Sequence, residues 1–268
     1  MTTHDRPTVS VVVPVKDDAR PLERCLASLA RQTVAPLEVL VVDNGSSDDS
    51  AETAAKGGAT VLYQGTPGIA AASRTGYDRA RGDVIARIDA DTRLPADWIE
   101  TLVEAFSSDA AVDVVTGRSI FTDGPRRARR IAALLYLGAY YALAGLALTH
   151  VPVFGSNFAM RREAWEQVRD EVHDSDRLHD DFDLSYHLGR RYRIRLLPQL
   201  RSGISMRPLI GGGGALRVRR GFSTVVVHWP HDLPWLRLAR RVALRRRQRL
   251  SALSRTAALT GRSSSPSR

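Results

Sequence analysis

Short apolar runs alternate with amphipathic stretches along the first half of the chain. Runs rich in valine, isoleucine and leucine predict buried strands at residues 9–13, 38–42, 59–63 and 84–88. Apolar side chains at helical spacing predict helices at residues 21–32, 50–56, 69–81 and 95–106. This alternation is typical of an α/β fold, so we expect a mostly parallel sheet with helices on both faces.

Polar residues follow three of the predicted strands, at the point where each strand ends. Pro14-Val-Lys-Asp-Asp18 follows the first, Asp43-Asn-Gly-Ser-Ser-Asp-Asp-Ser50 the second and Asp89-Ala-Asp91 the fourth. Each segment alone fits an ordinary turn or a helix cap. In open parallel sheets, however, ligands bind beyond the carboxyl ends of the strands. Together, the three segments predict a ligand site at that edge.

Asp89 and Asp91 carry the clearest chemistry of these segments. Alternate side chains of an extended segment point to the same side, so the two carboxylates can face one ligand. Carboxylate oxygens are the ligands that Mg²⁺ and Mn²⁺ prefer, and these ions then bridge to phosphate oxygens. The pair therefore predicts a divalent-metal site, although Asp-x-Asp alone is a common pattern.

The second half of the chain is less regular. A short arginine cluster at 126–130 precedes residues 131–148, which contain no charged side chain. Residues 155–165 predict a turn and then a helix from Arg161, with Trp165 as a packing residue. Seven carboxylates lie between residues 170 and 183, and those at 180–183 are placed to cap a helix that starts at Leu184.

Charge and cysteine content narrow the possible functions. The formal net charge is +10, but ten arginines and no acidic residue follow Asp232, which leaves 29 basic and 29 acidic residues in residues 1–232. A neutral body of this kind argues against a nucleic-acid-binding protein, although a tail that binds nucleic acid remains an alternative.

The single cysteine, Cys25, excludes an internal disulfide and favours a reduced, cytoplasmic setting. Residues 1–8 are polar and do not resemble a secretory signal.

Several motifs, taken in order, resemble those of family 2 glycosyltransferases with a GT-A fold. They are Val9-Ser-Val-Val-Val-Pro14, Val41-Val-Asp-Asn-Gly-Ser-Ser-Asp-Asp49, Gly68-Ile-Ala-Ala-Ala72 with Gly76, Ala80-Arg-Gly-Asp83, Ile88-Asp-Ala-Asp91, Gly155-Ser-Asn-Phe-Ala-Met160 and His179-Asp-Asp-Phe-Asp-Leu184. The resemblance covers residues 7–200 and implies a Rossmann-like GT-A sheet. It also implies an enzyme that uses a nucleotide-diphosphate sugar.

The resemblance implies roles for the donor-site residues. Pro14, Val15 and Asp43 would hold the base and ribose of the nucleotide. Asp89 would lie beside the ribose or diphosphate, and Asp91, with Asp89, would bind Mn²⁺ or Mg²⁺. Four other motif positions are expected to contact the donor: Asp17, Gly68, Arg74 and Ala90. Ser73-Arg74 stands where the family usually has Arg-Asn, which leaves the nucleotide open, and Arg207 is a further candidate phosphate contact.

Transfer itself is assigned to a pair of carboxylates. The resemblance implies that Asp181 is the catalytic base and that Asp180 stands where the family usually has glutamate. Crowding by other acidic residues predicts a raised pKa for Asp181, which suits a base near neutral pH. Gly155, Ser156 and Asn157 would shape the acceptor side, although Asn157 fits an ordinary turn equally well. A Gln-x-x-Arg-Trp motif is absent, which favours transfer of one sugar over processive synthesis.

The apolar stretch and the tail suggest where the acceptor lies. Residues 131–148 would form a helix about 27 Å long, but a single membrane crossing there would separate Asp89 from Asp181. We therefore expect this helix to pack on the sheet or to lie at a membrane interface. Trp235, Leu238, Ala239 and Val242 recur at helical spacing among arginines, as in interfacial basic helices. A solvated helix without a partner is the alternative for this segment.

The sequence thus predicts an inverting, metal-dependent glycosyltransferase that works in the cytoplasm, with a peripheral position at the inner membrane face as one location. Expected partners are a nucleotide-diphosphate sugar, a glycan or lipid-linked acceptor and an anionic membrane surface. We expect one catalytic domain at residues 1–232, with a donor half at about 7–117 and an acceptor half at about 118–232. A basic amphipathic helix and a disordered tail would follow at 233–268. Three alternatives remain: a sugar-nucleotide pyrophosphorylase, a nucleotide-binding relative without transferase activity, and a nucleic-acid-binding protein. The segment after the first strand contains no glycine, which disfavours the pyrophosphorylase.

Overall fold

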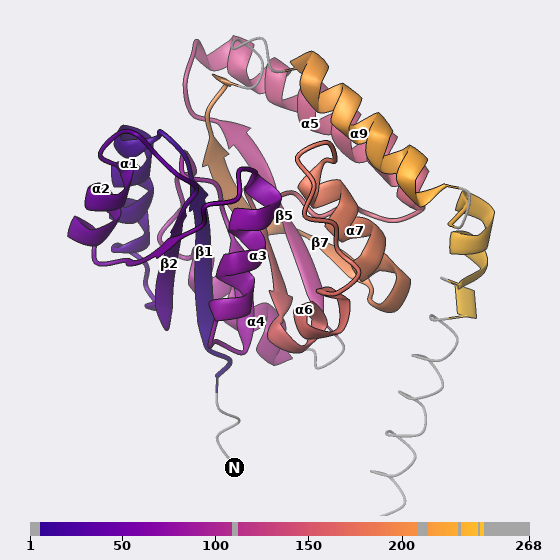
Figure 1. Ribbon diagram of the computed structural model, residues 1–268, viewed down its shortest axis with the longest axis horizontal. Helices are drawn as coiled ribbons and strands as arrows, with labels where there is room; N and C mark the ends of the chain where they lie inside the picture. Colours follow the sequence, from indigo (N-terminus) through magenta and orange to yellow (C-terminus); the bar gives the residue numbers. More distant parts are fainter. Residues whose placement is uncertain (1–5, 109–111, 208–213, 230–231, 241, 244–268) are drawn as a thin grey trace, which may run out of the picture.

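The computed structural model of the chain is shown in Figure 1. It describes residues 6–108, 112–207, 214–229, 232–240 and 242–243. Within these residues one sheet of seven strands runs through the molecule, with strand order β3-β2-β1-β4-β6-β5-β7. The strands are β1 (Val9–Val15), β2 (Glu38–Asp43), β3 (Thr60–Tyr63), β4 (Val84–Arg87), β5 (Val114–Phe121), β6 (Phe158–Arg161) and β7 (Ile194–Ile204).

The sheet is parallel except for β6. β1 pairs in parallel with β2 and β4, β2 with β3, and β5 with β7. β6 lies between β4 and β5 and runs antiparallel to both. The start of β6 therefore lies at the same sheet edge as the carboxyl ends of its neighbours, which brings the preceding residues 155–157 to that edge.

Helices cover both faces of the sheet, as predicted. Their bounds are α1 (Ala19–Leu29), α2 (Ser50–Lys56), α3 (Ile69–Arg79), α4 (Trp98–Ser108), α5 (Arg126–Leu148), α6 (Arg162–Val168), α7 (Asp180–Arg191) and α9 (Gly214–His228). One core packs Leu22 of α1 and Trp98 of α4 against β1 residues such as Val13. The other core packs Ala72 of α3, Trp165 of α6 and Leu184 of α7 against the opposite face.

Two segments near the predicted site differ from their sequence-based interpretation. Residues 158–161 form strand β6 before the helix begins, because Phe158, Ala159 and Met160 are fully buried between β4 and β5. Helix α7 starts at Asp180 and not at Leu184, so the acidic residues lie in its first turn. Its N-cap is His179, whose side chain makes no capping hydrogen bond.

Helices α5 and α9 lie side by side over one end of the sheet (Figure 1). The Arg217 guanidinium of α9 donates to the Tyr136 hydroxyl of α5 at 2.9 Å. One face of α5 packs Ala133 and Leu137 against Phe121 of β5. Among the described residues, Ile131–Leu148 is the one stretch long and apolar enough to cross a membrane, and 22% of it is buried.

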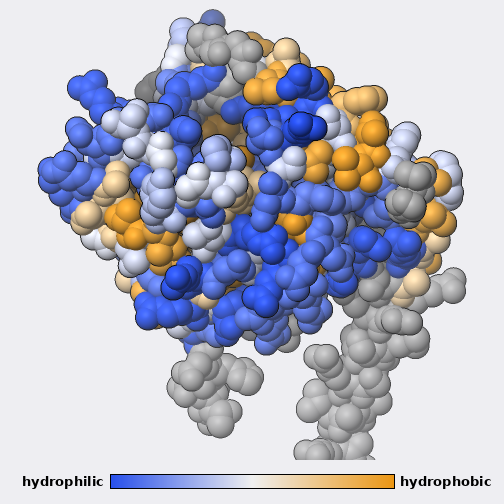
Figure 2. All heavy atoms as spheres, viewed as in Figure 1, coloured by the Kyte–Doolittle hydropathy of each residue, from blue (hydrophilic) through white to orange (hydrophobic). Residues whose placement is uncertain are grey.

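The outward faces of α5 and α9 expose many apolar side chains. We call these residues the apolar face: Ile131, Leu134, Leu135, Leu143 and Leu146 of α5, with Leu216, Val218, Phe222, Val226 and Val227 of α9. Figure 2 shows apolar side chains gathered over this part of the molecule, while the sheet-covering helices below are mostly hydrophilic. Because the segments before and after α5 meet at one sheet edge, the helix does not separate Asp89 from Asp181.

The described part of the tail is helical at residues 234–240 and 242–243. Trp235, Leu238 and Val242 are exposed there, as an interfacial helix requires. Arg237 differs from the expected surface arginine: its side chain is buried, binds the Asp232 carboxylate and lies 3.8 Å over the Tyr186 ring. Residues 244–268, including the predicted disordered end, lie outside the described residues.

Candidate active site

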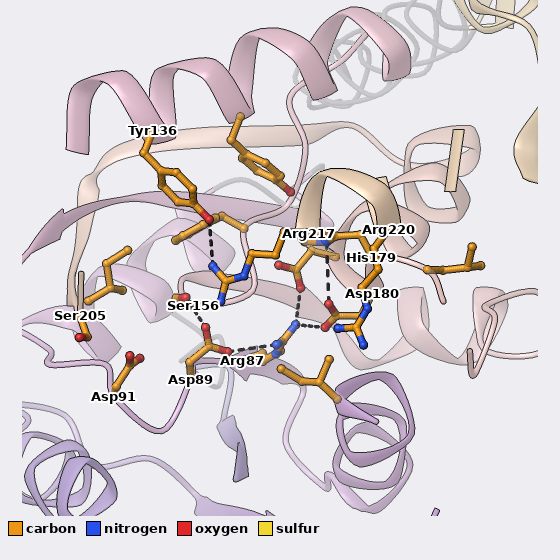
Figure 3. A pocket seen from close by; sticks show the side chains of 16 residues that line it. Arg87, Asp89, Asp91, Tyr136, Ser156, His179, Asp180, Ser205, Arg217 and Arg220 are labelled. Atoms are coloured by element: carbon orange, nitrogen blue, oxygen red, sulfur yellow. Dashed lines mark hydrogen bonds and ion pairs between the residues drawn. The ribbon is translucent and has the colours of Figure 1, made fainter. Parts of the chain in front are cut away.

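A cleft of about 310 Å³ opens where β4, α7, α5 and α9 meet (Figure 3). Its floor carries acidic and basic side chains from β4, the loop after it and the start of α7, namely Arg87, Asp89, Asp91, Asp180 and Asp181. Its roof carries side chains from α5 and α9, namely Tyr136, Tyr140, Arg217 and Arg220. The cleft is therefore charged below, and aromatic and cationic above.

Arg87 organises the floor of the cleft. It is the last residue of β4, and its side chain is 2% exposed. Its Nη1 donates to Asp180 Oδ2 at 2.8 Å and also to Asp181 Oδ1. Its Nη2 donates to Asp89 Oδ1 at 3.0 Å. One guanidinium thus joins the strand end that carries the predicted metal site to the helix that carries the predicted base.

The two carboxyls of α7 differ in their affinity for a proton. Burial raises the pKa of Asp181, and the neighbouring charge of Asp180 raises it further, against the opposing effect of Arg87. Burial also disfavours ionisation of Asp180, but Arg87 and His179 outweigh it and lower the pKa of that carboxyl. The pair therefore holds Asp180 ionised while Asp181 takes up and releases a proton at higher pH.

Gly155 completes the surroundings of Asp181. Its backbone N–H donates to Asp181 Oδ2 at 2.8 Å. A Cβ at this position would collide with both carboxylate oxygens of Asp181 and with the Arg87 guanidinium. Glycine is therefore required for the chain to approach the carboxylate this closely. The adjacent Ser156 hydroxyl donates to Asp89 Oδ2, so two of the three predicted acceptor-side residues contact the carboxylates of the cleft.

Asp91 lies beside Asp89 with a cationic partner. Burial and the charge of Asp89 raise the pKa of Asp91. Arg207 donates to Asp91 Oδ2 at 3.1 Å and to the two carboxylate oxygens of Asp18 at 2.7 and 2.5 Å. Grouped carboxylates of this kind, already bound to a cation of the chain, fit a divalent metal ion. Arg207, expected at a phosphate, thus contacts the predicted metal ligand.

The predicted nucleotide-binding residues lie at the neighbouring strand ends. Pro14 and Val15 are buried at the end of β1, and Asp43 ends β2. The Asp43 carboxylate accepts from the Ser46 backbone N–H at 3.0 Å. Asp17 has a positive φ of 51°, and its carboxylate accepts from the Ser47 backbone at 2.7 Å. Ala90 is buried between the two aspartates of the metal site.

Asn44 holds this edge together, although the sequence indicated only a turn there. Its side-chain Nδ2 donates to the backbone oxygens of Gln64 and Thr66 at 2.9 and 2.7 Å. Its Oδ1 accepts from the Gly68 N–H at 2.8 Å. Gly68 has φ +131°, a conformation open mainly to glycine, and it is the N-cap of α3. The start of α3 is thereby fixed next to the end of β2.

Arg74 and Asn157, which were predicted to contact the substrates, have partners outside the cleft. Arg74 is bound to the Asp174 carboxylate at 3.3 Å and to the Val172 carbonyl, so its guanidinium does not reach Asp89 or Asp91 here. Asn157 is fully buried, and its amide binds Trp98 Nε1 at 2.9 Å and the Leu200 carbonyl at 3.0 Å. Contrary to the predicted acceptor contact, the Asn157 side chain supports the cleft wall from behind.

Sequence reasoning missed several residues of the cleft. Arg87 carried a signal, because a charged residue two positions before Asp89 in an apolar strand shares its face. Tyr136 and Tyr140 belong to the uncharged stretch, whose pattern does not mark them as site residues. Arg217 and Arg220 belong to a helix that was not predicted. Their positions depend on how α5 and α9 fold back over the sheet, which no local pattern reports.

Comparison with known proteins identifies the family. The model of glycosyl transferase family 2 matches residues 10–169, more than half of the chain. The chain belongs to this family. It is 34% identical over 128 residues to glycosyltransferase AglE of Haloferax volcanii, covering 45% of this chain and 42% of that protein. It is 32% identical over 133 residues to the chondroitin synthase of Pasteurella multocida, covering 45% of this chain and 13% of that protein. The match thus spans less than half of these relatives.

Solved structures confirm the predicted GT-A fold of this family 2 glycosyltransferase. A mannosyltransferase from Pyrobaculum calidifontis, in complex with GDP-Man and Mn²⁺, superposes with a TM-score of 0.63 at 21% identity. That likeness covers 98% of this chain and 77% of the other. Glucosyl-3-phosphoglycerate synthase from Mycobacterium tuberculosis, with Mn²⁺ and UDP, superposes with a TM-score of 0.57 at 20% identity, over 82% and 79% of the two chains.

The role of Arg87 in the fold is testable. Arg87→Met should lower the free energy of unfolding by roughly 3–5 kcal/mol at pH 7, because two buried carboxylates lose their cation. The decrease in the free energy of unfolding should be smaller at pH 5. Without Arg87, the folded-state pKa of Asp180 rises above its unfolded value and the already raised pKa of Asp181 rises further, so protonation at lower pH favours the folded state. Urea denaturation at both pH values measures this.

Arg162→Met is the matched control for this variant. Arg162 pairs with Glu166 at the surface, where the two side chains are 40% and 46% exposed. Its loss should cost less than about 1 kcal/mol. An equal loss of stability in the two variants would contradict a central role for Arg87.

Proposed function

We propose that the chain is an inverting glycosyltransferase that moves one sugar from a nucleotide-diphosphate sugar to an acceptor hydroxyl. The observation that carries this proposal is the shared contact of Asp89 and Asp181 with the Arg87 guanidinium. A carboxylate suited to the donor and a carboxylate suited to base catalysis, 92 positions apart in the sequence, thereby face one cleft. That arrangement is what a single displacement between two bound substrates requires.

The donor would lie along the carboxyl ends of β1, β2 and β4. Asp91, together with Asp89 and Asp18, would hold a divalent cation there, which supplies Lewis-acid neutralisation of the leaving diphosphate. The Mn²⁺ in the structures of the mannosyltransferase and the glucosyl-3-phosphoglycerate synthase supports this assignment. Binding of a cation would compete with Arg207 for Asp91, so we infer that Arg207 turns from Asp91 toward the donor phosphates.

Asp181 would act as the base for the acceptor. Arg87 and the Gly155 N–H fix its carboxylate, so an ionised Asp181 has one defined orientation. The acceptor oxygen forms a bond to the anomeric carbon, the bond from that carbon to the diphosphate oxygen breaks, and the acceptor proton passes to Asp181. Attack from the side opposite the leaving group inverts the anomeric carbon, and one carboxylate suffices for it.

The acceptor would enter under α5 and α9. The roof of the cleft offers the Tyr136 and Tyr140 rings and the Arg217 and Arg220 guanidinium groups, which suit a sugar ring and an anionic group respectively. The apolar face lies on the outer side of the same two helices. We therefore infer a lipid-linked acceptor, reached from a membrane surface at the cytoplasmic side.

Metal-dependent donor binding is the first prediction. UDP, GDP and dTDP are each added to the protein with and without Mn²⁺, and the melting temperature is measured. One nucleotide with Mn²⁺, at about 100 times its Kd, should raise Tm by roughly 5–10 °C. Asp91→Asn should remove the Mn²⁺-dependent part, whereas Asp97→Asn, an exposed aspartate outside the cleft, should keep it. A full shift in Asp91→Asn would exclude Asp91 as the metal ligand.

Base catalysis by Asp181 is the second prediction. Asp181→Asn should keep the Mn²⁺-dependent nucleotide shift and lose roughly 10²–10⁴-fold in turnover. Turnover is followed as release of nucleoside diphosphate from the matching nucleotide sugar, with a lipid extract as acceptor. Unchanged turnover would remove Asp181 from this role. Nucleotide binding with no turnover in the unmodified chain would instead favour a binding protein without transferase activity.

The pH dependence of turnover follows from the same pair. Since a base must be ionised and the pKa of Asp181 is raised, kcat/KM should rise with pH, with its midpoint above the range of ordinary carboxyls. Asp180→Asn removes a charge that raises this pKa, so the midpoint should move to lower pH. A midpoint that stays in place would show that Asp180 does not act on Asp181.

Membrane contact is the fourth prediction of this function. The protein should float with vesicles that contain anionic lipids. Leu134→Glu/Leu135→Glu should weaken this binding by roughly 10–100-fold, because these side chains are 74% and 66% exposed on the apolar face. Val61→Glu, at an exposed position on β3, is the control and should bind as before. Equal flotation of all three proteins would exclude the apolar face as the membrane contact.

A further inference from the structure

A second cluster of titratable side chains lies behind the catalytic helix. It comprises His173 in the loop after α6, Asp183 and His187 one turn apart on α7, and His228 at the end of α9. Residues two apart on a helix point about 200° apart, so Asp183 faces away from the side on which Asp181 contacts Arg87. None of the four side chains lines the cleft described above. The cluster is therefore separate from the donor and acceptor site.

The four residues bring one donor atom each into a small volume. All four atoms lie within 4.8 Å of one another. His173 Nδ1 and His228 Nε2 are each 2.8 Å from Asp183 Oδ1, and His187 Nε2 is 3.7 Å from Asp183 Oδ2. Three of the four residues, all but His173, are buried. Three imidazoles and one carboxylate thus converge on a point that is largely shielded from water.

His187 provides the evidence that this cluster binds a ligand. Its side chain is 5% exposed, and among the described residues neither ring nitrogen has a hydrogen-bond partner. A neutral imidazole has one N–H donor and one acceptor nitrogen, and burying both without partners is costly. Glu171 Oε2 lies 3.5 Å from His187 Nδ1, on the side away from the cluster. A carboxylate behind the ring is how metal-bound histidines are commonly oriented, with Nδ1–H toward the carboxylate and Nε2 toward the metal.

We propose that His173, Asp183, His187 and His228 form a structural zinc site. A three-histidine, one-carboxylate set is a donor combination that Zn²⁺ binds with tetrahedral geometry. At Zn–ligand distances of about 2.0–2.1 Å, tetrahedral donors lie about 3.3 Å apart. The two histidine nitrogens now 2.8 Å from Asp183 Oδ1 would move away from it by a few tenths of an ångström, and His187 Nε2, now 3.7 Å from Asp183 Oδ2, would turn toward the ion. Asp183 would supply one negative charge to the ion, while the Glu171 carboxylate behind His187 also binds the Arg191 guanidinium at 2.5 Å.

The site would fasten α9 to the rest of the protein. His228 belongs to α9, whereas the other three ligands come from α7 and the loop before it. The Tyr186 ring stacks on the His228 ring, with 4.0 Å between the ring centroids, and the Arg237 guanidinium lies over the Tyr186 ring. The His228 ring is therefore already held in place. Arg217 and Arg220 of the same helix reach into the roof of the cleft. The ion would therefore fix the roof from the far side of α7, without contact with substrate.

Zinc binding is measured directly on the full chain. The protein is stripped with a chelator, loaded with Zn²⁺, freed of excess metal and analysed for zinc content, with Asp91→Asn as background to remove the donor-site metal. We expect one zinc per chain, and a rise in Tm of roughly 5–10 °C with zinc at about 100 times its Kd. His187→Gln and His228→Gln should each lower the zinc affinity at least 100-fold and abolish the rise.

His179→Gln is the matched control. His179 forms, with Asp180 and Asp181, the other group of three potential ligands in the described residues, and it faces the cleft. Its substitution should leave zinc content unchanged in the Asp91→Asn background. Loading with Co²⁺ in place of Zn²⁺ should give the intense visible absorption of tetrahedral cobalt, which a hydrogen-bonded cluster without metal cannot produce.

Three results would overturn the proposal. They are absence of zinc from the loaded chain, loss of zinc in His179→Gln, and full zinc content in His187→Gln or His228→Gln. If the buried variants fail to fold by circular dichroism, His173→Gln provides the test, because that side chain is 42% exposed and its replacement leaves the core intact. Zinc retained at full affinity in His173→Gln would then exclude the proposed site.

Discussion

The site depends on one buried cation. Arg87 ends a central strand, where its guanidinium is removed from water and shared by Asp89, Asp180 and Asp181. Without that charge, the mutual repulsion of the three carboxylates and the desolvation of Asp180 and Asp181 would be uncompensated. With it, the end of β4 and the start of α7 are held in one geometry. The same guanidinium limits how far burial can raise the pKa of Asp181.

The topology of the sheet makes this contact possible. Because β6 alone runs antiparallel, the residues that precede it arrive at the edge where the parallel strands end. Gly155 and Ser156 can then donate to Asp181 and Asp89 from one short segment. Asn157, the next residue, turns inward and binds Trp98 and the Leu200 carbonyl, which anchors the segment to the core. Gly155 and Ser156 thus contact the carboxylates of the cleft, while the adjacent Asn157 packs in the core.

Much of the fold and half of the site were accessible from the sequence, for identifiable reasons. Continuous apolar strands and their acidic ends report on local burial, so β1, β2, β4 and the Asp89–Asp91 pair could be placed from pattern alone. Strand β6 was not predicted, because its four residues lie between a turn and a helix and are too few to show a periodic pattern. The partners of Arg74 and the positions of the roof residues Arg217 and Arg220 could not be predicted, because they depend on contacts between residues distant in sequence.

The apolar face has a consequence for the kinetics of encounter. It occupies the outer side of the two helices whose inner side roofs the cleft, so the proposed membrane contact and the proposed acceptor entry share one layer of the protein. With this face on a bilayer, a lipid-anchored acceptor would arrive by lateral diffusion within a plane. Its effective concentration would then follow its surface density, which compartment volume does not dilute. An acceptor affinity too weak for a three-dimensional search would suffice for this two-dimensional one.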